Sequence, residues 1–522
     1  MAGVVILPEK VLKKLNARIS PHLKVCFFSA LLVGLAAHLY KITNWLPNWD
    51  SLVFRYDAQN MLALGRWFLP VACSFSSFYD LPFLNGMAAI IFHALGAVFI
   101  CKTLNVKKKI TSALIGAFIV SFTSVTSVMM YNYVADGYSI AFFLSTLAAF
   151  YMTKEKPNYL ISTALIVLSS GIYQAYITVT IMLILLHLTD EIIFNNSSFK
   201  VILKKSVCML LSGVTGVALY GVILKVLLGI FSVQLLDYQG ASAAASLSSL
   251  DLAAFLYNIK KTFIDFFFDF SDGISIYVVL NIFVLVFTVL YYLKCIIKNK
   301  IYKSPAKILM IAVLGILLVP ASGALAFINP NVDYHNLMLM GYSVFYLFFI
   351  PVYERGSEAT KKRTAIKCWT VLTAAVIIIM NQVVISNVSY HKAQMAYEKS
   401  YGVLIRIADR IEQTPNSENC DKILVIGALD DSEAYSVKLP PEITGITDGY
   451  ILRADDETVS QSVLCSALND YCGTDYRFVS GQEKQALAQR EDIKAMERWP
   501  SPYCVTVADD TLIIKLGTEG EN

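Results

Sequence analysis

The sequence reads FLNGMAAIIFHALGAVFIC at residues 83–101 and ITSALIGAFIVSFTSVTSVMM at residues 110–130, with the basic segment KTLNVKKK between them. Each run is close to the ~20 apolar residues that an α-helix needs to cross a ~30 Å hydrocarbon core. In that core an unpaired backbone polar group costs several kcal/mol, so spanning segments are helices or closed barrels. Because the apolar residues are continuous and do not alternate, the pattern predicts helices and excludes a barrel.

The same pattern recurs along the chain, which is 56% hydrophobic and only 16% charged. It predicts an α-helical polytopic membrane protein with about 11 transmembrane helices. Polar residues around Gly171 mark either a turn between two short helices or a kink in one, and the charge pattern downstream favours the turn. The expected spans lie near residues 24–42, 83–101, 110–130, 136–152, 159–171, 173–192, 206–231, 275–293, 307–327, 336–353 and 366–386.

Basic residues predict the orientation of these spans, because Lys and Arg concentrate in cytoplasmic loops. Residues 102–109 and 294–307 are rich in Lys, and residues 355–367 and the segment before residue 24 contain both Lys and Arg. We therefore expect a cytoplasmic N-terminus, with loops 43–82 and 232–274 and the C-terminal tail on the outer face. The loops of that outer face contain few basic residues, namely Arg55, Arg66, Lys260 and Lys261. The net charge of +4 reflects this distribution, so we expect no nucleic-acid partner.

The composition changes near Ser386, which divides the chain into a membrane domain, residues 1–386, and a tail, residues 387–522. The tail predicts a small extracytoplasmic α/β domain, whose simplest role is that of an accessory or acceptor-binding module. Its predicted elements are an amphipathic helix at 391–412, a strand at 422–427, helices at 457–468 and 482–499, and two strands within 503–516.

The first outer loop, residues 44–82, is unusually polar and aromatic for a connector between two helices. Asp50 follows the first span directly and is a candidate general base, provided that an acceptor hydroxyl lies within hydrogen-bond reach. Its alternative role is the N-cap of a helix at 51–65. Asp57 follows at i+7 and lies on the same face of such a helix, so it is a second candidate catalytic carboxylate.

Three basic residues are candidates to bind the phosphate of a lipid-linked donor. Arg55 and Arg66 offer guanidinium groups that can contact two phosphate oxygens at once. Lys225 lies within an apolar run, where a charge is a functional hypothesis by default. The alternatives are salt bridges for the arginines and snorkelling to the membrane surface for the lysine.

Further polar and aromatic groups come out on the predicted outer face at three turns, and they suit a sugar or glycan acceptor. Aromatic rings can pack on the apolar faces of a sugar, and amide or carboxylate groups can bind its hydroxyls. An interfacial aromatic belt explains the tyrosines alone, but not the polar groups beside them. The candidates are Asp136, Tyr138, Tyr173, Gln174, Asp333 and His335.

The second outer loop contains an amphipathic segment at residues 252–270, which is rich in phenylalanine and also contains Lys260 and Asp265. Such a segment is typical of a helix that lies in the plane of the membrane interface. It could gate a lipid substrate or anchor the loop. The chain has no spacing of His and Cys typical of a metal site, although its scattered outer aspartates would permit a divalent cation.

Four short motifs, in this order and on this side of the membrane, resemble the type II family of bacterial O-antigen glucosyltransferases, the serotype-converting group. The outer C-terminal module is similar too. The motifs are Asn48-Trp49-Asp50, Leu64-Gly65-Arg66-Trp67, Asp136-Gly137-Tyr138 and Gly171-Ile172-Tyr173-Gln174.

The resemblance implies the multispanning type C glycosyltransferase architecture in a bacterial plasma membrane. It also implies transfer of a hexose, usually glucose, from a polyprenyl-phosphate donor to a surface glycan such as O-antigen or teichoic acid, with inversion. Such enzymes place a catalytic acidic residue in the first outer loop, where this chain has Asp50. Many members have two adjacent acidic residues there; here the second carboxylate would come from Asp57 or Asp136.

Other functional classes remain open on the sequence alone. A polysaccharide polymerase or ligase would also face outward, but it would extend a glycan into a ladder of products. A flippase or transporter would place its ionisable groups near the middle of the membrane and contain paired repeats, which this sequence lacks. A scaffold or receptor would leave the acidic and arginine-containing first loop unexplained.

Overall fold

A computed structural model describes the fold over residues 8–53, 61–77, 79–195, 197–236, 252–268, 276–327, 334–355, 362–430, 452 and 457–517. Within these residues, nine helices are long and apolar enough to cross a membrane, and two shorter apolar segments, Tyr159–Ile172 and Asn336–Val352, accompany them. The predicted fold, a polytopic helical membrane protein with a small sheet near its C-terminus, is confirmed.

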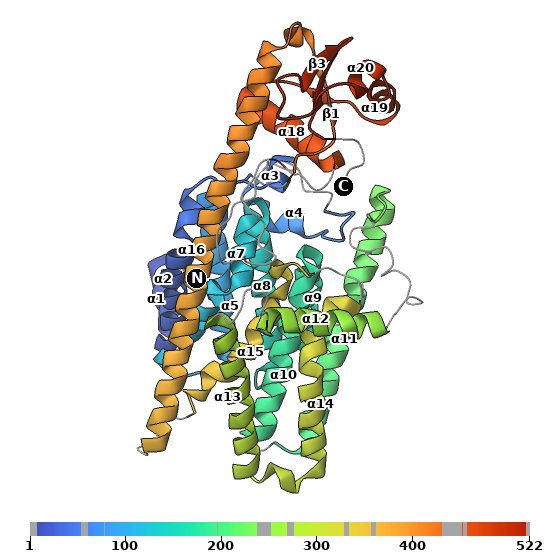
Figure 1. Ribbon diagram of the computed structural model, residues 1–522. Helices are drawn as coiled ribbons and strands as arrows, with labels where there is room; N and C mark the ends of the chain where they lie inside the picture. Colours follow the sequence, from blue (N-terminus) through green and yellow to red (C-terminus); the bar gives the residue numbers. More distant parts are fainter. Residues whose placement is uncertain are drawn as a thin grey trace, which may run out of the picture.

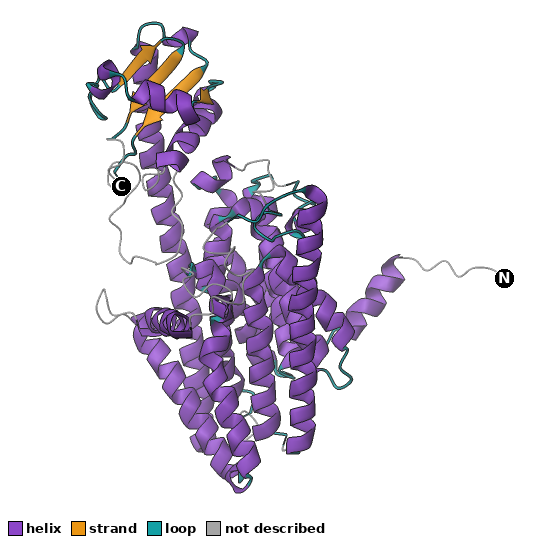
Figure 2. Ribbon diagram, turned by 90° about the vertical axis from the view of Figure 1, so that its right-hand side faces the viewer, coloured by secondary structure: helices purple, strands orange, loops and turns teal. Residues whose placement is uncertain are grey.

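The helices form an upright bundle (Figures 1 and 2). We call the end of the bundle nearest the C-terminal sheet the sheet end, and the other the basic end, after its lysine-rich loops. The first half of the bundle consists of α1 Pro8–Arg18, α2 Pro21–Thr43, α3 Trp49–Val53, α4 Leu69–Ala72, α5 Pro82–Thr103, α6 Lys109–Ser121, α7 Thr123–Met130, α8 Asn132–Thr153, α9 Tyr159–Ile172, η1 Gln174–Tyr176 and α10 Ile177–Ile193.

The second half contains the longest helices and several short 3₁₀ segments. It consists of α11 Phe199–Phe231, α12 Leu252–Phe268, α13 Ile276–Lys298, η5 Ile301–Lys303, α14 Pro305–Ser322, η6 Ala324–Phe327, η7 Asn336–Tyr342, α15 Ser343–Phe349, η8 Ile350–Val352 and α16 Lys362–Gln413.

Small residues allow the first helices of the bundle to pack closely, as is usual where no water drives helices together. A Cβ atom at Gly96 of α5 would lie 2.4 Å from the ring of Phe142 on α8. At Gly116 of α6 it would lie 2.2 Å from the carbonyl oxygen of Cys26 on α2. The backbones of α5–α8 and of α2–α6 therefore approach to distances that larger side chains would prevent.

The predicted spans at 110–130 and 336–353 are divided in the structure, and the turn predicted near Gly171 is present. Phe122 has an extended ψ of 137° and separates α6 from α7. Tyr173 is also extended, at φ −156° and ψ 115°, so α9 and α10 are two helices joined by a turn, as the charge pattern favoured. The segment at 336–353 is built from η7, α15 and η8.

Helix α12 confirms the helix predicted in the second outer loop and ends at Phe268. It lies across the bundle, perpendicular to its neighbours, in both views (Figures 1 and 2). One side is buried: Phe267 is fully covered, and its ring lies 5.8 Å from that of Tyr342 and 5.3 Å from that of Phe345, measured between centroids. The aromatic side of α12 is therefore part of the core.

Helix α16 is continuous from Lys362 to Gln413, whereas the sequence suggested a span and a separate amphipathic helix. At 1.5 Å per residue its 52 residues extend about 78 Å, well beyond a ~30 Å hydrocarbon core. It stays attached to the bundle past Ser386, because the Tyr390 hydroxyl lies 2.7 Å from His38 Nδ1 on α2. The proposed domain boundary at residue 386 therefore falls within one helix.

The C-terminal module has a four-stranded sheet in the order β2-β1-β4-β3, which confirms the predicted strands. β1 Lys422–Ile426 pairs parallel with β2 Arg477–Phe478 and β4 Thr511–Lys515, and β3 Val505–Ala508 pairs antiparallel with β4. Helix α18 Glu457–Cys472 is as predicted. The predicted helix at 482–499 is instead α19 Gly481–Ala488 and α20 Glu491–Lys494, because Arg490 between them is extended at ψ 138°.

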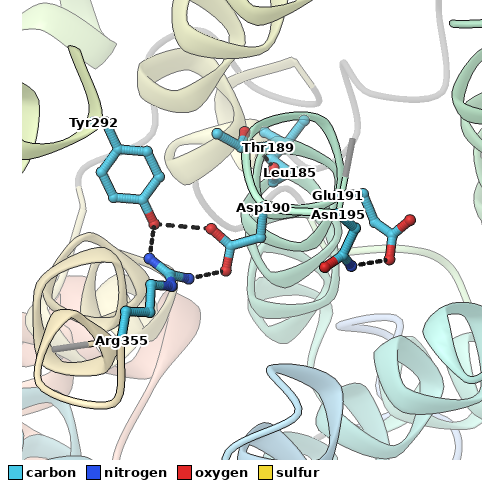
Figure 3. Close-up of polar contacts among 7 residues, drawn as sticks. All are labelled: Leu185, Thr189, Asp190, Glu191, Asn195, Tyr292 and Arg355. Atoms are coloured by element: carbon cyan, nitrogen blue, oxygen red, sulfur yellow. Dashed lines mark hydrogen bonds and ion pairs between the residues drawn. The ribbon is translucent and has the colours of Figure 1, made fainter. Parts of the chain in front are cut away.

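At the basic end, a buried ion pair joins three helical segments (Figure 3). The Arg355 guanidinium, just after η8, pairs with the Asp190 carboxylate of α10. The Tyr292 hydroxyl of α13 donates to Asp190 at 2.9 Å and accepts from Arg355 at 3.2 Å. We call these three residues the basic-end clamp.

Candidate functional site

Asp50 lies in the first turn of α3, at the sheet end, and is 8% exposed. Asn48 caps this helix instead: its Oδ1 accepts from the Ser51 backbone N–H at 3.0 Å, and its amide donates to the Met130 carbonyl at 3.2 Å. The alternative role of Asp50 as a helix N-cap is therefore wrong, because α3 already begins at Trp49. Residues 61–65, at the end of the predicted helix, form turns.

Arg66 enters the bundle beneath α3 and is 9% exposed. Its Nη1 donates to the Tyr138 hydroxyl at 2.9 Å, and its guanidinium carbon lies 5.1 Å from the centroid of the Tyr173 ring. The rings of Tyr138 and Tyr173 stack with centroids 4.5 Å apart. Three residues predicted for donor or sugar binding, on three separate segments, are thus in direct contact.

Gln174 holds the turn that precedes Arg66. Its Nε2 donates to the Leu64 carbonyl at 3.2 Å and to the Tyr220 hydroxyl of α11 at 2.8 Å. The same Tyr220 hydroxyl donates to the Gly65 carbonyl at 3.0 Å. Gln174 therefore positions the loop that contains Arg66 by binding the backbone of that loop. Tyr220 shares this role, and no sequence pattern marked it as a site residue.

A Gly65→Ala substitution tests this turn. Gly65 has φ +76°, and a Cβ there would lie 2.6 Å from the Tyr220 hydroxyl and 2.8 Å from Gln174 Nε2. An L-residue in this conformation costs about 1–2 kcal/mol before any clash. We expect lower thermal stability and a higher KM for the sugar donor, measured side by side. Gly229→Ala on α11, where a Cβ meets nothing within 4 Å, should change neither.

Asp136, predicted to bind sugar or acceptor, is fully buried and bonded within the protein. Its Oδ2 accepts from the Ser76 hydroxyl at 2.8 Å and its Oδ1 from the Gly137 backbone N–H at 2.9 Å. Burial, and after it the Asp136 carboxylate, raise the pKa of the Cys73 thiol well above its usual range, so the thiol stays protonated and bonds to Asp136. These contacts attach the loop after α4 to α8.

A second cluster of buried polar and charged residues was not predicted from the sequence. Asp80 Oδ1 accepts from the Asn132 amide at 2.6 Å, and the carboxylate acts electrostatically on Lys41. Lys41 is only 1% exposed and donates to the Leu46 carbonyl at 2.6 Å. A lysine at the end of an apolar helix suggests snorkelling, so only the fold reveals that this one points inward.

The remaining predicted residues lie apart from the Arg66 contacts or outside the described part of the chain. His335 caps η7, where its Nδ1 accepts from the Leu337 N–H at 3.3 Å, and its ring lies 5.8 Å from that of Tyr131. Lys225 is exposed on α11, next to Leu224, which faces Gly65. The predicted residues that lie outside the described residues are Arg55, Asp57 and Asp333.

Residues 39–352 match the family model described as Glucosyl transferase GtrII. The chain belongs to this family. The matched segment runs from the end of α2 through η8, so it contains every site element described above and excludes α16 and the C-terminal sheet. The curated proteins and the solved structures compared with the chain gave no match. Family membership confirms the resemblance seen in the sequence and supports glucosyl transfer to surface glycans by a membrane protein.

In this GtrII family member, helix α3 of the first loop packs against the C-terminal module, which lies outside the matched segment. Leu52 of α3 is 5% exposed and belongs to the hydrophobic core formed with Leu464 and Leu468 of α18. The Trp45 indole Nε1 donates to the Tyr471 hydroxyl of α18 at 3.1 Å. Figure 1 shows α3 between the bundle and α18. The module therefore supports the helix that contains Asp50.

A Leu52→Ala substitution should loosen this support in the GtrII protein. Truncating a buried leucine typically costs about 2 kcal/mol or more. We expect a lower kcat, an unchanged KM for the donor, and faster proteolysis at the junction between module and bundle. Val53→Ala, on the same helix at a half-buried position, is the matched control and should have a smaller effect on all three. Equal effects of the two variants would contradict a role of the C-terminal module in supporting α3.

Proposed function

We propose that the protein transfers a hexose, most simply glucose, from a polyprenyl-phosphate donor to a cell-surface glycan on the outer face of a bacterial plasma membrane. The observation behind this proposal is the position of Asp50 and Arg66. Both belong to the segment matched by the glucosyl transferase family. Asp50 is in α3 and Arg66 precedes α4, and Figure 1 shows these two helices at the sheet end of the bundle, beneath the C-terminal module. The basic loops lie at the opposite end, which favours placing the sheet end outside.

The proposed reaction is a single inverting displacement. Asp50 accepts the proton of an acceptor hydroxyl while that oxygen attacks the anomeric carbon of the donor sugar. The bond from the anomeric carbon to the phosphate oxygen breaks, and polyprenyl phosphate leaves with the electron pair. The cationic Arg66 stabilises the charge that develops on the phosphate, and such stabilisation is usually a large part of catalysis.

Arg66 is well prepared for this role. Its guanidinium is held by the Tyr138 hydroxyl and lies over the Tyr173 ring, so little side-chain freedom is lost when a phosphate binds. The rings of Tyr138 and Tyr173 stack on each other and are themselves buried, so they position the arginine. In this proposal Arg55, Asp57 and Lys225 remain further candidates for the donor and the second carboxylate.

The C-terminal module is proposed to lie outside the cell, where it could bind the acceptor glycan as well as support α3. The predicted boundary at residue 387 becomes, in this view, the point at which α16 leaves the membrane. Covalent labelling from the periplasmic side of whole spheroplasts tests the sidedness: a cysteine placed at exposed Tyr503 should react, and one placed at exposed Tyr302 should not.

The function itself is tested by in vitro transfer. Purified protein in detergent receives polyprenyl phosphate carrying radiolabelled glucose, together with surface glycan extracts. We expect label in the glycan at one residue per acceptor site, without a ladder. A ladder would favour the polymerase or ligase function. Movement of the intact lipid-linked sugar across a vesicle membrane, with no transfer, would favour the flippase function and overturn the proposal.

A further inference from the structure

Tyr133 has a hydroxyl group that its surroundings do not use. It lies in the first turn of α8, is fully buried, and its hydroxyl has no hydrogen-bond partner among the residues that the structure describes. Two polar residues near it on the same helix do make side-chain hydrogen bonds: the Asn132 amide donates to Asp80, and the Tyr138 hydroxyl accepts from Arg66. Buried polar groups without partners are rare in folded proteins, so each needs an explanation.

Tyr133 lies between two chain positions that contact the candidate site. Three residues earlier, the Met130 carbonyl accepts from the Asn48 amide at the start of α3. Five residues later, the Tyr138 hydroxyl binds Arg66. The packing thus brings both the start of α3 and the arginine loop against the N-terminal part of α8. Asp50 and Arg66 are also both close enough to act electrostatically on Tyr133.

The chemistry of the neighbours indicates which ligand the hydroxyl would take. A phenol can donate one hydrogen bond, and an anionic oxygen is the acceptor that makes such a bond strongest. Arg66 favours an anion on one side, while Asp50 opposes one on the other. An anion that binds here therefore lies toward Arg66, and the phenol O–H offers it a further donor.

We propose that the Tyr133 hydroxyl donates a hydrogen bond to a phosphate oxygen of the lipid-linked donor, next to the oxygens bound by Arg66. This inference rests on the proposed function, since it assumes a donor of the polyprenyl-phosphate class. Tyr133 thereby becomes a substrate-binding residue that holds the phosphate on the side facing Asp50. Asp50 and Arg66 retain 8% and 9% exposure, so the donor would reach the buried phenol from their side.

The test is a Tyr133→Phe variant, which removes one oxygen atom and keeps the ring. Because that oxygen has no partner in the ligand-free protein, we expect the melting temperature without ligand to stay the same or rise. Binding of polyprenyl phosphate, measured by its stabilisation of the protein in detergent micelles, should weaken about tenfold. The KM for the sugar donor should rise by a similar factor.

Tyr342→Phe is the matched control. Tyr342 is also a fully buried tyrosine, but its ring packs among Phe263, Phe266 and Phe267 of α12. Its loss of a hydroxyl should leave binding and KM unchanged.

Three results would overturn the inference: wild-type affinity for polyprenyl phosphate in Tyr133→Phe, a lowered melting temperature without ligand, or equal losses in the two variants. The first leaves the proposed function intact if the wild-type protein transfers glucose. Failure of the wild-type protein to bind polyprenyl phosphate or to transfer any hexose would instead remove the proposed function, and with it this inference. Binding of inorganic phosphate alone, unaffected by the substitution, would also count against Tyr133 as a phosphate ligand.

Discussion

Asp50→Asn is expected to reduce glucosyl transfer about 10²–10⁴-fold, the range typical for loss of a positioned general base. Asparagine has nearly the same shape as aspartate but cannot accept the acceptor proton. The fold should tolerate it, because Asn48 and not Asp50 caps α3. The measurement is the initial rate with polyprenyl phosphate-glucose at saturating donor, together with the melting temperature of each protein.

Asp80→Asn provides the matched control for Asp50→Asn. Asp80 is the other buried carboxylate of the first loop, but its oxygen accepts from the Asn132 amide, and an asparagine can keep that bond. We expect this variant to lose stability through Lys41 while it retains most of its turnover. If Asp50→Asn kept more than a tenth of the wild-type rate, Asp50 would not be the base.

Arg355→Met should destabilise the bundle by about 3–5 kcal/mol, the loss expected when one partner of a buried ion pair is removed. The basic-end clamp explains the size of the effect. Asp190 would keep only the Tyr292 hydroxyl as a partner, and both charged side chains are about one-fifth exposed or less. Thermal or denaturant unfolding in detergent measures the loss, and the kcat of the folded fraction should stay near wild type, because the clamp and Asp50 lie at opposite ends of the bundle.

Two further variants separate the clamp from a general effect of charge at the basic end. The double variant Asp190→Leu with Arg355→Met removes both charges and should recover part of the lost stability. Lys205→Met breaks a more exposed ion pair with Glu191, in which the lysine is 32% exposed, and should cost less than about 1 kcal/mol. Equal losses for Lys205→Met and Arg355→Met would show that Asp190 is not an uncompensated charge in the single variant.

The membrane-spanning helices were predictable because continuous apolar runs report them directly. Breaks inside these runs were not. Phe122 is as apolar as its neighbours, yet its extended backbone divides α6 from α7. The continuity of α16 was missed for a similar reason: polar residues near Ser386 suggested the end of a span, but they are buried against other helices, where Ser386 bonds to Thr126.

Some residues of the candidate site were predictable from the sequence, but the contacts among them were not. The sequence selected Arg66, Tyr138 and Tyr173 as separate candidates, and the fold brings them into contact. No sequence pattern distinguishes Asp136, which is bonded to Ser76, from Tyr133 three residues earlier, whose hydroxyl has no hydrogen-bond partner within the described part of the chain. Both residues sit on one polar, tyrosine-rich turn, and only tertiary packing distinguishes them.

The bond between Trp45 and Tyr471 joins residues 426 positions apart, and Leu52 of the first loop lies in the core of the last module. During translation the first loop is therefore synthesised long before the C-terminal module that supports it. In an unfinished chain the Asp50 helix would lack the hydrophobic core against which Leu52 packs. That core could form only after the last strands have left the ribosome. It follows that glycan modification should begin only with the complete polypeptide, and that chains shortened at the C-terminus should reach the membrane yet remain inactive.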